Sequence, residues 1–195
     1  MGRFMGMLDK KLKRFLDEDL HVFGLENVNI KDPDFLFRRL REVFVGVDFQ
    51  VFDAEKIVGF DHVRFAVLNA FKAFKAGRNI SKSFPVEVML YVSGQRQIGK
   101  ALKMVGVCRE TKNIVLVVFG SGEVASKVLD EVCRMVGGKL NSGVLKVNRE
   151  KIETVKKTFG ISDLEIKTQI FSGVGLEKAV EKLVIERVAL LATQQ

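Results

Sequence analysis

Two almost uninterrupted apolar segments, residues 84–92 and 114–119, limit the folds open to this chain of 195 residues. Each has the length of a strand, and each is followed by a glycine-containing turn and a segment with helical spacing of apolar residues. A strand without polar interruption is typical of a sheet covered on both faces. We therefore predict that both segments are central strands of one sheet on which helices pack.

The remaining pattern alternates between strands and helices, which is typical of an α/β protein. Asp32-Pro33 predicts the N-cap and first residue of a helix, Asn148 predicts a second N-cap, and Gly77 is well placed to end a helix. The further strands are predicted near residues 21–24, 47–51 and 143–147, and the helices near residues 33–45, 61–76, 97–105, 122–137, 149–158 and 176–193.

The domain organisation is expected to be simple. Residues 1–19 place Leu8, Leu12 and Leu16 on one helical stripe, which predicts an amphipathic N-terminal arm. Residues 20–195 are expected to form one α/β domain with a mixed central sheet and a C-terminal helix that docks a partner. No apolar stretch reaches the roughly 18 residues of a membrane span, and the N-terminus does not have the pattern of a secretory signal. We expect a cytoplasmic protein without membrane contact.

The residue types that build metal and catalytic sites are sparse. Cys108 and Cys133 do not form a disulfide framework, and with His21 and His62 they do not make a zinc site. We expect two reduced, mostly buried thiols. No recognisable nucleophile motif and no cluster of acidic residues is present. The sequence therefore predicts no catalytic residue, no metal and no cofactor.

The polar run from Ser93 to Ile98 follows the first apolar segment and precedes a helical one. A strand that breaks at Ser-Gly and turns into a helix leaves the first backbone N–H groups of that helix unpaired. Those donors and the positive end of the helix dipole suit an anion such as phosphate. The alternative is an ordinary capped helix start in a loop.

The excess positive charge gathers around this run. The formal net charge is +8, and residues 72–103 alone carry seven Lys and Arg against one acidic residue. Arg96, Lys100 and Lys103 share one side of the expected helix, opposite an apolar stripe that would pack on the sheet. This basic ridge would suit a nucleic-acid backbone, whereas the alternative is a basic side that only faces solvent.

A phosphate loop is the competing interpretation of the same run. Gly94 and Gly99 have four residues between them and Lys100 follows, but Ala101 stands where a magnesium-binding Ser or Thr is needed. A stand-alone nucleotide-binding protein or enzyme that uses the Ser93–Lys100 turn as a phosphate site remains the alternative function.

Three stretches resemble the PRPK-binding subunit family of the KEOPS complex, most of all its archaeal branch. They are Phe49-Gln50-Val51-Phe52-Asp53-Ala54, then Ala73-Phe74-Lys75-Ala76-Gly77-Arg78-Asn79-Ile80-Ser81, and Glu87 through Ser93-Gly94-Gln95-Arg96-Gln97-Ile98. The likeness covers about residues 20–190 and leaves the arm aside.

The resemblance implies a non-catalytic subunit of a complex that adds threonylcarbamoyl to the adenosine beside the anticodon of tRNA. Members of this family dock on a kinase-like ATPase and recruit tRNA through its single-stranded 3′ CCA end. Contact with the catalytic transferase subunit would be indirect. The residues expected to bind RNA are Ser93, Gly94, Gln95, Arg96, Gln97, Lys100, Lys103, Arg78, Asn79 and Lys82. A scaffold without RNA contact is the third alternative.

The C-terminal helix is the predicted docking element for the kinase-like ATPase. Apolar residues surround most of its circumference, more than a helix packed on one side needs. The alternative is a helix that lies between the sheet and another helix of the same chain. The residues predicted to bind the partner are Leu183, Val184, Ile185, Val188 and Leu191.

Overall fold

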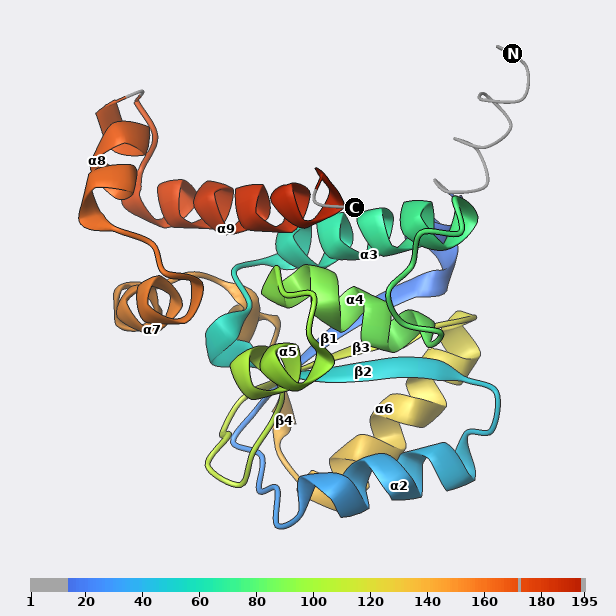
Figure 1. Cartoon of the computed structure of the whole chain (residues 1–195). Coiled ribbons are helices and arrows are strands. Elements are labelled where there is room, and N and C mark those ends of the chain that lie inside the picture. The colour runs from blue at the N-terminus through green and yellow to red at the C-terminus, as the bar shows by residue number, and fades with distance from the viewer. Residues whose placement is uncertain (1–13, 172, 194–195) are drawn as a thin grey trace.

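One four-stranded sheet with helices on both faces organises the chain (Figure 1). The structure, a computed structural model, describes residues 14–171 and 173–193. The strands lie in the order β2-β3-β1-β4 and every pairing is antiparallel. Their bounds are Leu20–Glu26 for β1, Asp48–Asp53 for β2, Ile114–Phe119 for β3 and Lys139–Leu140 for β4. The predicted α/β class with helices packed on a central sheet is confirmed, although the sheet is antiparallel throughout and not mixed.

Helices form two layers around this sheet (Figure 1). One layer contains α2 and α6, and the other contains α3, α4 and α9, with α5, α7 and α8 at its margin. The helices are α2 (Pro33–Val43), α3 (Phe60–Lys75), α4 (Phe84–Ser93), α5 (Ile98–Val105), α6 (Gly122–Val136), α7 (Arg149–Phe159), α8 (Asp163–Phe171) and α9 (Leu176–Thr193).

Strand β3 connects the two layers because its side chains alternate between them. Ile114, Leu116 and Val118 belong to the core beneath α2 and α6. The intervening Val115 and Val117 belong to the core beneath α3, α4 and α9. A strand covered on both faces needs apolar residues at every position. The prediction for 114–119 is therefore confirmed, boundaries included.

The helix signals in the sequence are also confirmed. Asp32 caps α2, and its carboxylate accepts hydrogen bonds from the backbone N–H groups of Asp34 and Phe35. Asn148 caps α7 in the same manner. These short polar side chains satisfy donors that the first helical turn leaves unpaired.

The prediction of a strand at 84–92 is wrong, because this segment forms α4. Eight of its ten residues are buried, between α3, α5, α9 and β2. A helix buried on all sides has no polar stripe, so its sequence cannot be told from that of a buried strand by periodicity. Pro85 in the first turn was the usable helix signal.

The prediction of a strand at 143–147 is also wrong, since Ser142–Leu145 form a 3-10 turn, η3. The side chain of Asn141 accepts a hydrogen bond from the N–H of Gly143 and closes that turn. The turn packs on Gly24 of β1, where an added Cβ atom would lie 2.5 Å from Val144 Cγ2. Sequence patterning had no signal for the short β4 or for α8.

Two further short helical turns lie in the part of the chain that the structure describes. The π-helical η1, Phe15–Asp19, leads into β1 and buries Leu16, and the 3-10 turn η2, Ala54–Lys56, follows β2. The predicted N-terminal arm, residues 1–19, lies for the most part outside the described residues.

Candidate nucleic-acid interface

The predicted RNA-binding turn joins two helices instead of a strand and a helix. Gly94 ends α4 in the left-handed conformation, with φ of 62°. The N–H of Gln95 donates to the carbonyl of Leu90 at 3.0 Å, which closes the last turn of α4. Ser93 is buried, and its hydroxyl bonds to the same carbonyl. Ser93 and Gly94 therefore shape the turn, while Arg96 and Gln97 are exposed.

Helix α5 continues from this turn with two kinds of exposed surface. Lys100 and Lys103 are exposed, as the basic ridge requires. Ala101 and Val105 are buried, but Ile98 and Leu102 are about half exposed. The apolar stripe predicted to pack on the sheet is only partly covered, and the main neighbour of α5 is the helix α4. The side chain of Gln97, the N-cap residue of α5, makes no capping hydrogen bond.

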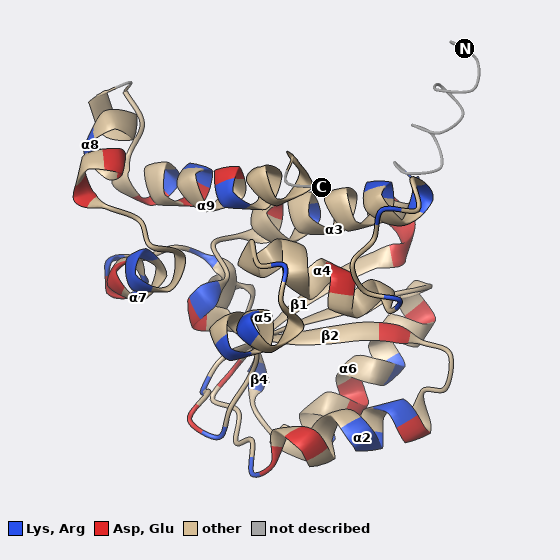
Figure 2. Ribbon diagram, viewed as in Figure 1, with Lys and Arg blue, Asp and Glu red and all other residues tan. Residues whose placement is uncertain are grey.

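The other predicted RNA-binding residues lie in the loop 77–83 before α4. Arg78 and Lys82 are exposed and Asn79 is partly buried. The Asn79 amide donates to the carbonyl of Ser81 at 2.9 Å. Since α4 has ten residues, this loop and the 94–97 turn lie roughly 15 Å apart along the helix axis. Figure 2 shows cationic segments beside both ends of α4.

An open cavity of about 600 Å³ lies between α2 and α5. Phe37, Ile98 and Leu102 contribute apolar walls. Arg38 and Arg41 of α2 also line the cavity, together with the carboxylates of Asp34 and Glu42. Sequence reasoning missed both arginines, although their spacing of three residues places them on one side of α2.

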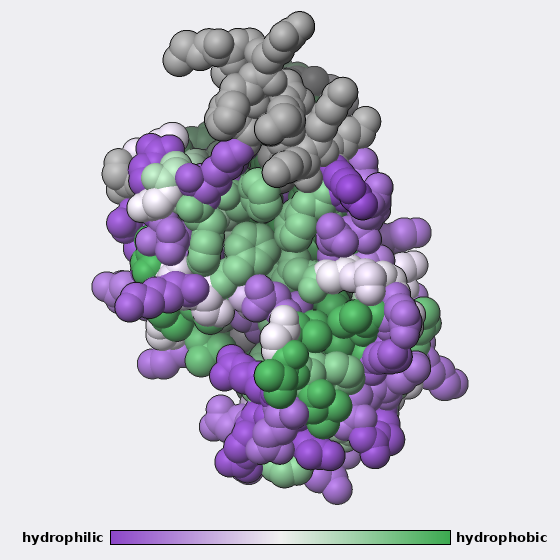
Figure 3. Space-filling view, turned by 90° about the vertical axis from the view of Figure 1, so that its right-hand side faces the viewer, coloured by the Kyte–Doolittle hydropathy of each residue, from purple (hydrophilic) through white to green (hydrophobic). Residues whose placement is uncertain are grey.

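A second open cavity, of about 630 Å³, lies beside the first residue of α4, Phe84. It is aromatic: the rings of Phe15, Phe84 and Phe119 contact one another, with centroids 5.0 to 6.2 Å apart. Lys75 at its edge immediately precedes the 77–83 loop region. Figure 3 looks onto this side of the molecule and shows its apolar surface. The exposed cations of the 94–97 turn and α5 therefore lie near one cavity with apolar walls, and those of the loop 77–83 lie near the other.

A buried histidine supports the end of α4 that leads into the turn. His62 of α3 is fully buried; its Nδ1 accepts from the N–H of Val58, and its Nε2 lies 2.9 Å from the carbonyl oxygen of Val92. Burial lowers the pKa of His62 to about 4, so the ring is neutral and donates from Nε2. His62 thus fixes the backbone just before Ser93.

The predicted partner-binding residues of α9 have a different environment from the one expected. Leu183, Val184, Val188 and Leu191 are buried in the core shared with α3 and α4, and Ile185 is partly buried. These residues therefore pack within their own chain, as in the alternative, but the main neighbours of α9 are the helices α3, α4, α7 and α8 and not the sheet. The exposed side of the C-terminal half of α9 consists of Glu186, Ala189, Leu190 and Thr193.

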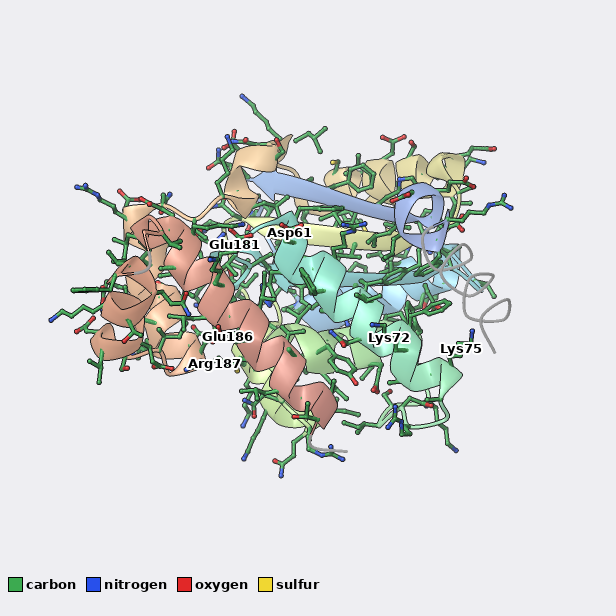
Figure 4. All side chains as sticks on the ribbon, turned by 90° about the horizontal axis from the view of Figure 1, so that it is seen from above. Asp61, Lys72, Lys75, Glu181, Glu186 and Arg187 are labelled. Carbon is green, nitrogen blue, oxygen red and sulfur yellow. The ribbon has the colours of Figure 1, made fainter. Side chains whose placement is uncertain are left out.

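An ion pair joins α9 to α8. Arg187 Nη2 lies 2.6 Å from Glu165 Oε1 of α8, and this bond together with two from Ser162 lowers the pKa of Glu165 to about 2. From above, α9 lies beside α3, with Glu181 near Asp61 and with Lys72 and Lys75 toward the other end of α3 (Figure 4). Glu181 is itself paired within α9, its Oε2 lying 2.9 Å from Nζ of Lys178.

The structure argues against the phosphate-loop interpretation of the Ser93–Lys100 run. Gly99 and Lys100 lie within α5, and a helix precedes the turn, so the run does not form the strand–loop–helix of a phosphate loop.

Cys108 is exposed and Cys133 partly buried, contrary to the expected burial of both thiols. Within the described residues, no group of three or more His, Cys, Asp or Glu could hold a metal ion. No helix in residues 14–171 and 173–193 has the length and hydropathy to cross a membrane.

Comparison with known proteins places the chain in one family. The model of the family described as kinase binding protein CGI-121 matches residues 27–192. The regulatory protein Cgi121 of Methanocaldococcus jannaschii is 28% identical over 151 residues, which are 77% of this chain and 88% of that protein. The KEOPS complex subunit Cgi121 of Pyrococcus abyssi is 36% identical over 70 residues, which are 36% of this chain and 40% of that protein. Since the match spans most of the fold, the chain belongs to the CGI-121 family of kinase-binding proteins.

Proposed function

We propose that this chain is a non-catalytic subunit of a KEOPS tRNA-modification complex, that it binds the kinase-like ATPase subunit, and that it recruits tRNA through the 3′ CCA end. Membership of the CGI-121 family and the names of its relatives, a regulatory protein and a KEOPS subunit, support the assembly. The observation that carries RNA recruitment is the α2–α5 cavity, because it combines cationic and apolar groups beside the Arg96 turn.

The chemistry of this cavity suits a single-stranded end. Unstacked bases bind on apolar or aromatic surfaces while their phosphates meet Arg and Lys. Ile98 and Leu102 offer the apolar surface, and Arg38 and Arg41 offer planar cations for phosphate. Cytosine and adenine carry exocyclic amino groups, for which a carboxylate such as Glu42 is a suitable acceptor.

Trimming the CCA end from tRNA is expected to weaken binding at least tenfold, because the proposed cavity then loses its ligand. Arg41→Ala and Arg96→Ala should each weaken binding of intact tRNA by about 1–2 kcal/mol and have little effect on trimmed tRNA. Filter binding or fluorescence anisotropy measures both. Arg149→Ala, at an exposed arginine of α7, is the matched control. Equal affinity for intact and trimmed tRNA would exclude recruitment through the CCA end.

The exposed stripe of α9 is the proposed docking surface for the kinase-like ATPase. Glu186, Ala189, Leu190 and Thr193 follow the spacing i, i+3, i+4 and i+7, and all are exposed. A partner that receives one helix in a groove contacts residues with this spacing. The four buried apolar residues on the other side of α9 act indirectly, by holding this stripe in place.

Leu190→Arg is expected to lower the affinity for the kinase-like ATPase at least tenfold, because it places a charge at the centre of the stripe. Leu190 is 53% exposed, so the free energy of unfolding should change by less than about 0.5 kcal/mol. Co-purification and calorimetric titration measure the affinity. Leu140→Arg, on β4 and also well exposed, is the matched control. Undiminished binding by Leu190→Arg would place the docking surface elsewhere.

A further inference from the structure

The loop 77–83 carries two exposed cations, and a buried acidic residue fixes its backbone. Glu87 of α4 has no exposed surface. Its Oε2 accepts hydrogen bonds from two consecutive backbone N–H groups, those of Ile80 at 3.0 Å and Ser81 at 2.7 Å. The loop is thus attached at its midpoint, between Arg78 and Lys82, to the helix that follows it.

Further bonds within the loop depend on the same point. The hydroxyl oxygen of Ser81 accepts from the N–H of Ser83, and the carbonyl of Ser81 accepts from the side chain of Asn79. The N–H of Arg78 bonds to the carbonyl of Ala73 at the end of α3. Ser81 is therefore the residue through which Glu87 determines the form of the loop.

The arrangement is costly for a residue with only a packing function. Glu87 Oε1 is buried and has no hydrogen-bond partner among the described residues. Burying a carboxylate is unfavourable unless hydrogen bonds to it compensate the cost, and here Oε2 accepts both of these bonds. An apolar residue of similar size would fill the space without this cost, but it would leave the N–H groups of Ile80 and Ser81 without an acceptor.

We propose that Glu87 is a positioning residue for RNA binding, whose carboxylate holds the loop 77–83 in the form that presents Arg78 and Lys82 to phosphates. The inference rests on the proposed recruitment of tRNA and names a second contact region, the loop 77–83, whose residues do not line the α2–α5 cavity. A loop already in its binding form loses less conformational entropy when RNA binds. The aromatic hollow edged by Lys75 and Phe84 lies beside this region and offers stacking surface.

Three variants test the proposal. Glu87→Met keeps the volume and removes both acceptor atoms, and Glu87→Gln keeps one oxygen that can accept from both N–H groups. The double variant Arg78→Ala/Lys82→Ala removes the cations and leaves the anchor. Glu87→Met should lower tRNA affinity about tenfold, and Glu87→Gln should stay within about twofold of the wild type.

The salt dependence of binding separates positioning from stability. Each phosphate contact to a single strand contributes about 0.7 to the slope of log affinity against log salt. Loss of two contacts should make the slope shallower by about 1.4 in both Glu87→Met and the double variant. Adding Glu87→Met to the double variant should produce no further loss. Lys100→Ala, in α5, should add its full effect to that of Glu87→Met.

Hydrogen exchange reports on the anchor without RNA. The amides of Ile80 and Ser81 should be protected in the wild type and in Glu87→Gln, and should exchange freely in Glu87→Met. A Glu87→Met chain that melts earlier but keeps the wild-type salt slope would overturn the proposal and leave RNA recruitment standing. A wild-type chain without salt-dependent tRNA binding would overturn both.

Discussion

Val184→Arg is expected to unfold the chain. Val184 is fully buried, in the core that α9 shares with α3 and α4. An arginine there would place an unpaired charge among apolar side chains, which costs about 4 kcal/mol or more in the free energy of unfolding. Net stabilities of domains are only about 5–15 kcal/mol, so most of the stability would be lost. Circular dichroism during urea unfolding, and recovery of soluble protein, measure this effect.

Comparison with Leu190→Arg separates loss of folding from loss of partner binding. Both substitutions introduce the same charge on the same helix, but Leu190 is 53% exposed and Val184 is fully buried. The exposed variant should fold and lose its partner, whereas the buried variant should lose the fold first. A Val184→Arg chain that unfolds at the wild-type urea concentration, and fails only to bind the kinase-like ATPase, would contradict the packing of α9 described above.

The sequence predicted those parts of the fold for which a residue type or pattern is typical of a single local structure. Asp or Asn before a helical segment indicates an N-cap, as Asp32 and Asn148 do here. Strand β3 follows from the length of its apolar segment and from the turns that flank it. In a segment that is buried on all sides, the apolar pattern does not distinguish a helix from a strand. Helix α4 and strand β3 are both almost entirely apolar, and only the packing of α3, α5 and α9 around α4 decides between helix and strand.

The candidate site was predicted in part for a related reason. The clustering of cations between residues 72 and 103 is visible in the sequence, and Arg78, Arg96 and Lys100 are indeed exposed. Arg38 and Arg41 come from α2, a distant segment, and only the packing of α2 against α5 places them at the same cavity. The environment of Glu87 likewise depends on the path of a loop. Long-range contacts of this kind leave no periodic signal along the chain.

A buried lysine is expected to make the stability of this protein rise with alkaline pH. Lys151 of α7 is 3% exposed, and its Nζ donates to the carbonyl of Val144 in η3 at 2.8 Å. Burial lowers the pKa of Lys151 to about 8 from its ordinary value of 10.5, although the nearby carboxylates of Glu55 and Asp53 oppose this shift. The charged form is therefore less favourable in the folded chain than in the unfolded chain.

The sign of the effect follows from proton binding. Below about pH 8 both states hold the proton on Lys151, and the full cost of burying the charge is present. Between pH 8 and 10.5 the unfolded chain holds more protons on this group, so the free energy of unfolding rises with pH. From pH 7 to 10 the gain from this one residue should be roughly 2 kcal/mol.

Lys151→Met isolates this contribution, because methionine fills the same space without a charge. Urea unfolding at pH 7, 8, 9 and 10 should show the stability of the wild type gaining roughly 2 kcal/mol relative to Lys151→Met. Lys157→Met, at an exposed lysine of the same helix, is the matched control and should run parallel to the wild type. The comparison cancels the titration of the remaining lysines, which all three chains share. Parallel curves for the wild type and Lys151→Met would show that Lys151 reaches solvent in the folded chain, and would contradict the packing of α7 against η3.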